Sequence, residues 1–269
     1  RYSKTPRSQI VAKPTQQSFY PPTWRDVLDR AKAISRCEAI DNPFPARDLF
    51  IKGPAIEYLT EAVSEVEGEG TVLDGYFWEE HKASMAILLY EDIGTFRSEI
   101  KKVARATVKA KCRLFPAGVT DREACATGVR EAVQDLLDEG SYLHGGVDEQ
   151  GRSDNFASDI LREVTINAFY EGKSALAMLF PKMFRKEAPR GAVALSGTIL
   201  KNAIDEYEDG AYSEKKLSKD VYSNVYDTII SLMDDLDEDP YHSAKCRRLR
   251  QAWATAATYG FTLVLYQHY

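Results

Sequence analysis

The sequence has 269 residues, of which 44% are hydrophobic and 28% are charged. These values are typical of a globular protein and exclude a collagen-like, low-complexity or fully disordered chain. A chain of this length forms one large domain or two small ones, and its core needs no disulfide or structural metal. No apolar run approaches the ~20 residues that a membrane-spanning helix requires, so we expect no membrane association.

Charge is distributed unevenly along the chain. The whole sequence carries −6, but residues 1–22 hold four basic residues and no acid, which leaves −10 on residues 23–269. A basic tail on an acidic body suggests binding to an anion or to an acidic surface, and a disordered leader or linker is the alternative. We therefore expect a basic N-terminal arm or linker over 1–22 and a separate domain over 23–269.

Helical patterns dominate the segment that follows. Apolar residues recur at helical spacing from about 23 to 40, from 54 to 66 and from 221 to 236, and proline or glycine ends each segment. We expect a buried helix over 76–92, a separate amphipathic helix over 95–114, and a capping box formed by Thr120 and Glu123. With no strand alternation and short loops, the sequence predicts an all-α fold. It is expected to be a single compact domain of about eight helices with an extended N-terminal arm.

The middle of the chain carries a familiar order of motifs. They are RSEIK at 97–101, KCRLF at 111–115, NFASDI at 155–160, AFY at 168–170, Pro181, VALSGT at 193–198, AIDEY at 203–207, Gly210, and Tyr222 to Tyr226. This order resembles a large helical domain family of basidiomycete fungi that is described only as being of unknown function. The resemblance covers about residues 93–237. It implies a fungal source, an all-helical fold and no known enzymatic role, and it brings no catalytic residues.

Catalytic and metal-binding motifs are absent from the sequence. It has no GxSxG elbow, no phosphate-binding P-loop and no HExxH pair. Cys112, Cys125 and His144 have spacings that match no closed zinc site, and the acidic run 234–239 lacks the glycine and glutamate of a calcium loop. We expect no cofactor, no metal and no catalytic residue. An enzyme with an unrecognised all-helical site stays a hypothesis, and it would need His81 or His144 beside carboxylates.

The spacing of the cysteines indicates a compartment in which thiols stay reduced. The four cysteines are widely and irregularly spaced and form no CxxC pair. This pattern is typical of reduced, buried thiols, so we expect an intracellular protein of the cytoplasm or nucleus.

One predicted helix carries a patterned surface. Arg97, Lys101, Arg105, Lys109 and Arg113 follow one another at i, i+4 spacing, Lys102 falls in the same sector, and Glu99 is the single acid between 97 and 113. Like charges at this spacing destabilise an isolated helix, so acids on a neighbouring helix or an anionic partner must offset them. The acidic segments 57–69 and 131–139 are candidates for the first, which would leave a solvated or internally compensated face.

A second basic cluster extends this pattern near the C-terminus. It comprises Lys245, Arg247, Arg248 and Arg250, and Arg185, Lys186 and Arg190 are candidates to extend it. We expect both sets to bind an anion or an acidic partner surface. The leading hypothesis is a non-enzymatic protein-interaction or self-assembly module with a protein partner or a second copy of itself. The alternative is a nucleic-acid-associated module that uses the arm and the 97–113 stripe on phosphates.

Overall fold

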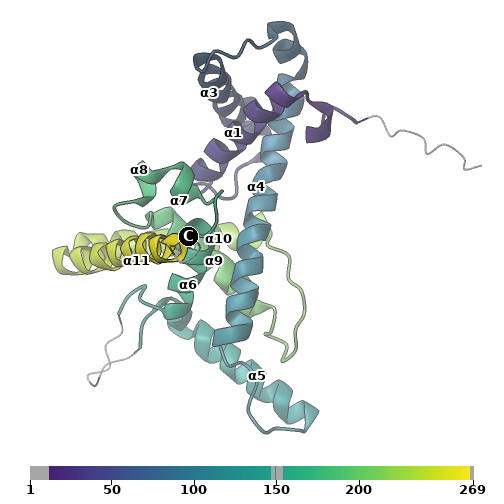
Figure 1. Cartoon of the computed structure of the whole chain (residues 1–269). Helices are drawn as coiled ribbons and strands as arrows, with labels where there is room; N and C mark the ends of the chain where they lie inside the picture. The colour runs from purple at the N-terminus through teal and green to yellow at the C-terminus, as the bar shows by residue number, and fades with distance from the viewer. Residues whose placement is uncertain (1–11, 147–148, 150–153, 267–269) are drawn as a thin grey trace, which may run out of the picture. The chain divides into compact units, whose positions relative to one another are not determined.

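The computed structural model describes residues 12–146, 149 and 154–266, with side chains described up to residue 258 of the last helix. In these residues the chain forms α-helices and short 3-10 helices and no strand, which confirms the predicted all-α class (Figure 1). The chain divides into two compact units. Unit 1 comprises residues 1–39 and 45–94, and unit 2 comprises residues 40–44 and 95–269.

Most helices follow one another directly or after a few residues, and the longest connections are residues 144–158 and 206–218. Their bounds are η1 (Gln17–Phe19), α1 (Pro22–Glu38), α2 (Arg47–Lys52), α3 (Pro54–Gly68), α4 (Gly75–Lys111), α5 (Arg122–Leu137), η2 (Asp138–Leu143), α6 (Asp159–Phe169), α7 (Leu176–Leu179), α8 (Pro181–Phe184), α9 (Arg190–Asp205), α10 (Lys219–Glu238) and α11 (Pro240–Tyr266).

Unit 1 is built on the packing of α1 against α3. The buried face of α1 includes Val27, Leu28 and Ala31, and that of α3 includes Leu59 and Ala62. Both sets have the three- and four-residue spacing of an amphipathic helix, so local periodicity decided which face turns inward. An ion pair also crosses this unit, because Arg36 Nε lies 2.6 Å from Asp92 Oδ2 in α4.

Part of the predicted N-terminal arm is folded onto unit 1. The rings of Phe19 and Tyr20 contact Phe77 and His81 of α4. The Tyr20 hydroxyl donates to the carbonyl of Pro14 at 2.6 Å. The remaining part of the arm, residues 1–11, lies outside the described residues.

Unit 2 surrounds α9. Every residue of α9 except Arg190 and Lys201 is buried, and α6, α10, α5 and η2 all contact it. Its sequence is rich in alanine and glycine, which lets neighbouring helices approach closely. A Cβ added at Gly197 would lie 2.8 Å from Leu143 Cδ2 and 3.1 Å from Ile229 Cδ1.

Two local expectations differ from the structure. The helices predicted over 76–92 and 95–114 form one continuous helix, α4, with Gly94 in its interior. A glycine costs only about 1 kcal/mol inside a helix, so it does not end one by itself. The cap of α5 is Asp121, whose carboxylate accepts the N–H of Ala124 at 2.8 Å, and Thr120 lies one residue before it.

Candidate interaction surface

The structure divides the predicted basic stripe of α4 into an inward part and an outward part. Lys101 is 7% exposed and its Nζ lies 2.9 Å from Oε1 of Glu206, the residue that follows α9. Arg105 donates to both carboxylate oxygens of Glu206, at 2.8 and 2.6 Å, and to Glu214 at 2.7 Å. Arg97 donates to the carbonyl of Pro43 and lies over the ring of Phe44. These three cations are therefore engaged within unit 2.

Glu206 is the centre of this inward network. It is fully buried and also accepts the backbone N–H of Lys215 at 3.3 Å. Burial alone raises the pKa of a carboxyl group, but the hydrogen bonds from Arg105 and Lys101 and the charge of Lys101 outweigh it, so the pKa of Glu206 lies below its ordinary value. A carboxylate at the C-terminal end of a helix opposes the helix dipole, which makes the two cations necessary.

The acids that compensate Lys101 and Arg105 were not identified from the sequence. We expected them in the segments 57–69 or 131–139, whereas the structure supplies Glu206 and Glu214 from the loop after α9. Sequence analysis missed Glu206 because an acid in an AIDEY motif has no local feature that marks it as buried.

The outward part of the stripe comprises Lys102, Lys109 and Arg113. All three are exposed, and none forms an ion pair with another residue in the part of the chain that the structure describes. Lys102 and Lys109 are seven residues apart and so lie on the same side of α4. These side chains remain available to solvent or to a partner.

The second basic cluster is divided in the same way. Arg250 is 8% exposed and lies 3.4 Å from Glu187, and Lys245 pairs with Asp154. Buried Arg250 and partly exposed Lys245 pair with acids outside α11, whereas Arg247 and Arg248 of this helix are exposed.

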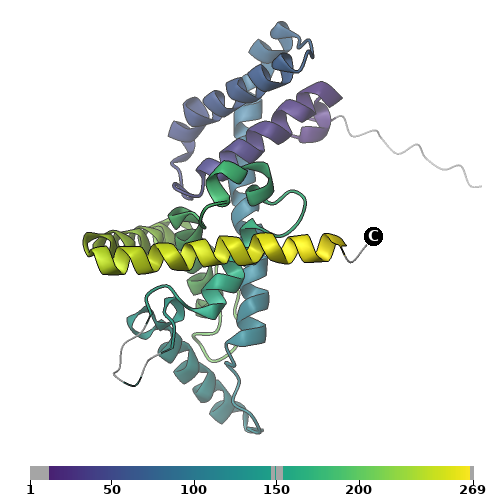
Figure 2. The same ribbon diagram turned by 60° about the vertical axis from the view of Figure 1, so that its left-hand side comes forward.

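A hydrogen bond brings a further basic segment beside α11. The N–H of Ala188 donates to the carbonyl of Arg250 at 3.1 Å, which fixes the loop after α8 against α11. Figures 1 and 2 both show α7 and α8 next to α11. Ala188 and Arg250 are 62 positions apart in the sequence, and the exposed basic side chains of the two segments that they join define a candidate surface.

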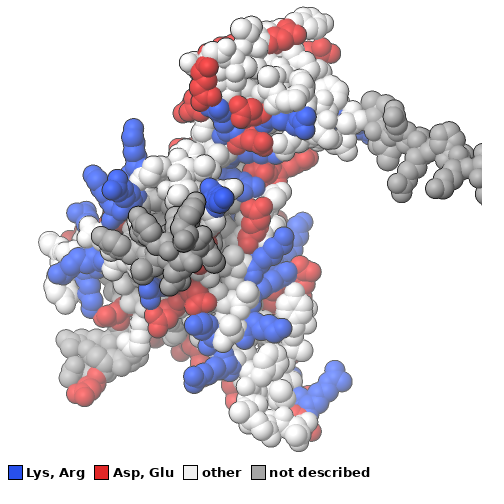
Figure 3. Space-filling model, in the orientation of Figure 1, with Lys and Arg blue, Asp and Glu red and all other residues white. Residues whose placement is uncertain are grey.

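We call this surface the basic–apolar surface. Its residues are Lys182, Arg185, Lys186, Arg247 and Arg248, together with Met178, Leu179 and Met183. Met178 is 58% exposed and Leu179 is 49% exposed, although both are large apolar side chains. Figure 3 shows Lys and Arg side chains gathered over the α7–α8 segment and α11. Sequence analysis did not find the apolar component, because the broken stretch between Gly172 and Pro189 has no clear helical period.

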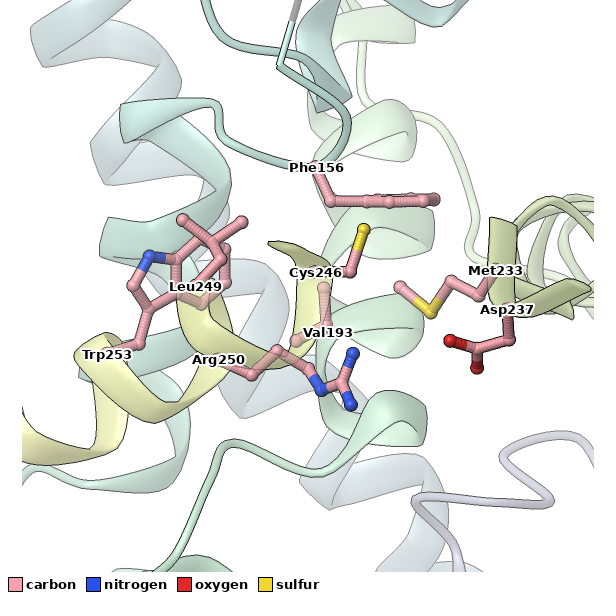
Figure 4. Close-up of a pocket in the computed structure, with 8 residues that line it drawn as sticks. All are labelled: Phe156, Val193, Met233, Asp237, Cys246, Leu249, Arg250 and Trp253. Carbon is pink, nitrogen blue, oxygen red and sulfur yellow. The ribbon is translucent and has the colours of Figure 1, made fainter. Parts of the chain in front are cut away.

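A narrow cleft lies between α9, α10 and α11 (Figure 4). Its cavity volume is only about 10 Å³, so it has room for no more than a single water molecule. The sulfur of Cys246 points toward the ring of Phe156, and burial raises the pKa of this thiol, so it stays protonated near neutral pH. Asp237 is already paired with Arg190 at 3.1 Å. These groups hold the helices together and offer no activated nucleophile.

The two histidines considered in the enzyme hypothesis lie in different units. His81 of unit 1 is packed among aromatic rings, with its centroid 4.4 Å from that of Phe77. His144 of unit 2 accepts the N–H of Phe156 at its Nδ1, and burial lowers its pKa. Each imidazole is used in packing or backbone hydrogen bonding.

Three further observations concern the described residues as a whole. No disulfide bond joins any of Cys37, Cys112, Cys125 and Cys246. No group of three or more His, Cys, Asp and Glu side chains is placed to hold a metal ion in the described part. Among these residues, none of the helices combines the length and apolar character needed to span a bilayer.

Comparison with known proteins places the chain in a family. A model of a domain of unknown function, DUF6532, matches residues 30–236. No curated protein and no solved structure matches the chain. The matched range includes the outward stripe and the α7–α8 part of the basic–apolar surface, and ends before α11.

Proposed function

Since the chain belongs to the DUF6532 family, whose function is not described, we propose from its own surface that it is a protein-interaction module. The basic–apolar surface binds a partner segment that is acidic on one side and apolar on another. The observation that carries this proposal is the exposure of Met178 and Leu179 beside Lys182, Arg185 and Lys186. Exposed apolar groups rimmed by charge are typical of protein interaction sites.

The apolar side chains favour a protein partner over nucleic acid. Phosphate backbones are bound by cations, and exposed methionine and leucine side chains add little to such contacts. An amphipathic acidic helix instead buries apolar residues on one face and presents carboxylates to flanking cations. Methionine also adapts to partners of different shape, because its side chain is unbranched and flexible.

The proposed setting follows from two other observations. The four cysteines form no disulfide with one another, which supports an intracellular location, where thiols stay reduced. The resemblance to a basidiomycete domain family supports a fungal source. The proposed role is binding, without a catalytic step.

The test is a titration followed by fluorescence anisotropy. The probe is a labelled synthetic helix of about 16 residues with leucine on one face and glutamate on the other. We expect it to bind the wild-type chain, and Arg185→Glu with Lys186→Glu to weaken binding at least about tenfold. Lys102→Glu with Lys109→Glu makes the same change in charge on the outward stripe and leaves binding unchanged.

Two results would contradict the proposal. Equal loss of affinity in both double variants would mean that overall charge, and not this surface, controls binding. Unchanged affinity on Met178→Ser with Leu179→Ser would remove the role of the apolar groups.

A second candidate function is nucleic-acid binding through the outward stripe. It is favoured by the alignment of exposed Lys102 and Lys109 on one side of α4, with Arg113 just beyond the helix. A labelled DNA duplex titrated at two salt concentrations tests it. Binding that falls steeply with salt and is lost in Lys102→Glu with Lys109→Glu would support this function, and salt-independent or absent binding would end it.

A further inference from the structure

The C-terminal half of α10 presents an acidic and apolar face. Asp235 and Glu238 are exposed, and neither forms an ion pair among the described residues. Leu232, three residues before Asp235, is 42% exposed, and Tyr241 at the start of α11 is 63% exposed. Residues three apart are neighbours on a helix, so Leu232, Asp235 and Glu238 form a continuous strip. We call these three residues the acidic–apolar strip.

The helix that carries this strip and the loop that carries Arg185 and Lys186 are connected through Arg190 within unit 2. Arg190, which opens α9, pairs with Asp234 of α10 and lies 3.1 Å from Asp237. The loop with Arg185 and Lys186 ends at Arg190, and it is held against α11 by the Ala188–Arg250 hydrogen bond. The two surfaces have opposite charge, and each includes at least one exposed apolar side chain.

When one molecule carries two surfaces of opposite charge, a dimer with two-fold symmetry can pair each surface with its counterpart on the other copy. A rotation by half a turn places the basic–apolar surface of one copy on the acidic–apolar strip of the other, and the same contact is made twice. A single ion pair at a surface contributes little, but the doubled contact also buries the exposed methionine and leucine side chains.

We propose that the partner bound by the basic–apolar surface is the acidic–apolar strip of a second copy of this chain. This inference rests on the proposed function and names its partner. We choose this partner because the strip is acidic and amphipathic, as a segment that binds the basic–apolar surface must be. The two surfaces have opposite charge, and both expose apolar side chains.

The experiment measures mass by light scattering after size exclusion. The wild-type chain is expected at twice its mass of 30.3 kDa, and at chain mass when salt is raised. Two variants invert one surface each. The first is Lys182→Glu with Arg185→Glu and Lys186→Glu, which leaves three acids against Arg247 and Arg248, and the second is Asp235→Lys with Glu238→Lys. All five residues are exposed, and circular dichroism checks that both variants keep the wild-type helix content.

Each variant alone is expected to be a monomer, because its two surfaces then carry the same sign. An equimolar mixture is expected to form a one-to-one pair, since the first variant is acidic on both surfaces and the second is basic on both. Variants that stay dimeric, or a mixture that stays monomeric, would overturn the pairing. The salt titration of the wild-type chain tests the charge dependence without any substitution.

The outcomes separate this inference from the proposed function. A wild-type monomer that still binds the synthetic acidic helix would overturn self-association and leave the interaction surface standing. A wild-type monomer that binds no acidic helix would remove both. A salt-insensitive dimer would assign the contact to another surface.

Discussion

Arg105 and Glu206 are 101 residues apart in the sequence and are joined by two hydrogen bonds of 2.8 and 2.6 Å. The guanidinium donates through Nε and one Nη to the two oxygens of a carboxylate that has no exposure to solvent. This fork geometry is the strong form of an arginine–carboxylate pair. Together with Lys101 it fixes α4 to the end of α9.

Removing the negative charge at Glu206 should destabilise unit 2. Glu206→Gln leaves Lys101 nearly buried beside a neutral group, and breaking a buried pair costs about 3 kcal/mol or more. Urea unfolding followed by circular dichroism measures the loss. Glu214→Gln is the control, because this carboxylate also pairs with Arg105 but is 70% exposed, and its removal should cost less than about 1 kcal/mol. Equal effects of the two variants would contradict the central role of Glu206.

The same carboxylate predicts a pH dependence of stability. The pKa of Glu206 is lowered in the folded state, so its contribution is complete above the unfolded value of about 4.3 and is lost as pH falls through the folded value. The difference in the free energy of unfolding between wild type and Glu206→Gln should therefore shrink as pH falls below about 4.3. Urea titrations across the acid range measure it. A constant difference down to pH 3 would show that Glu206 does not titrate in this way.

Because neighbouring helices pack closely around α9, we predict that a larger side chain at position 197 destabilises the fold. A methyl group there would lie 2.8 Å from Leu143 Cδ2, so Gly197→Ala should destabilise the chain by about 1–3 kcal/mol. Gly94→Ala is the matched control inside another helix, where a Cβ meets no atom within 4 Å. It should stabilise the chain by about 0.5–1 kcal/mol. Thermal unfolding of both variants checks the opposite signs.

The cap of α5 predicts that alanine substitutions at Asp121 and Thr120 differ in their cost to stability. Asp121→Ala removes the acceptor for the N–H of Ala124 and should cost about 1 kcal/mol. Thr120→Ala should cost nearly nothing, although the sequence pattern assigned the cap to Thr120. If Thr120→Ala cost more than Asp121→Ala in urea unfolding, the capping box predicted from the sequence, with Thr120 as the cap, would be correct.

Local chemistry in the sequence determined the helical class and most helix positions. Apolar spacing in α1 and α3 identified their buried faces, and this information is local because a helix repeats every 3.6 residues. The small and apolar run at 193–198 lies in α9, and only the structure shows that this helix is buried on nearly all sides. Helix ends were less certain, since a glycine such as Gly94 or adjacent cap residues such as Thr120 and Asp121 differ by only about 1 kcal/mol.

Only the tertiary structure decided which cations are available. Lys101 and Lys102 are neighbours in the sequence, yet one is paired with buried Glu206 and the other is exposed. The sequence shows where basic residues lie on the helix. The acid that neutralises Arg105, however, comes from a loop about a hundred residues away. The basic–apolar surface likewise exists only because Ala188 bonds to Arg250 and joins two distant segments. Sequence supplied the residue types, and long-range packing decided which of them face a partner.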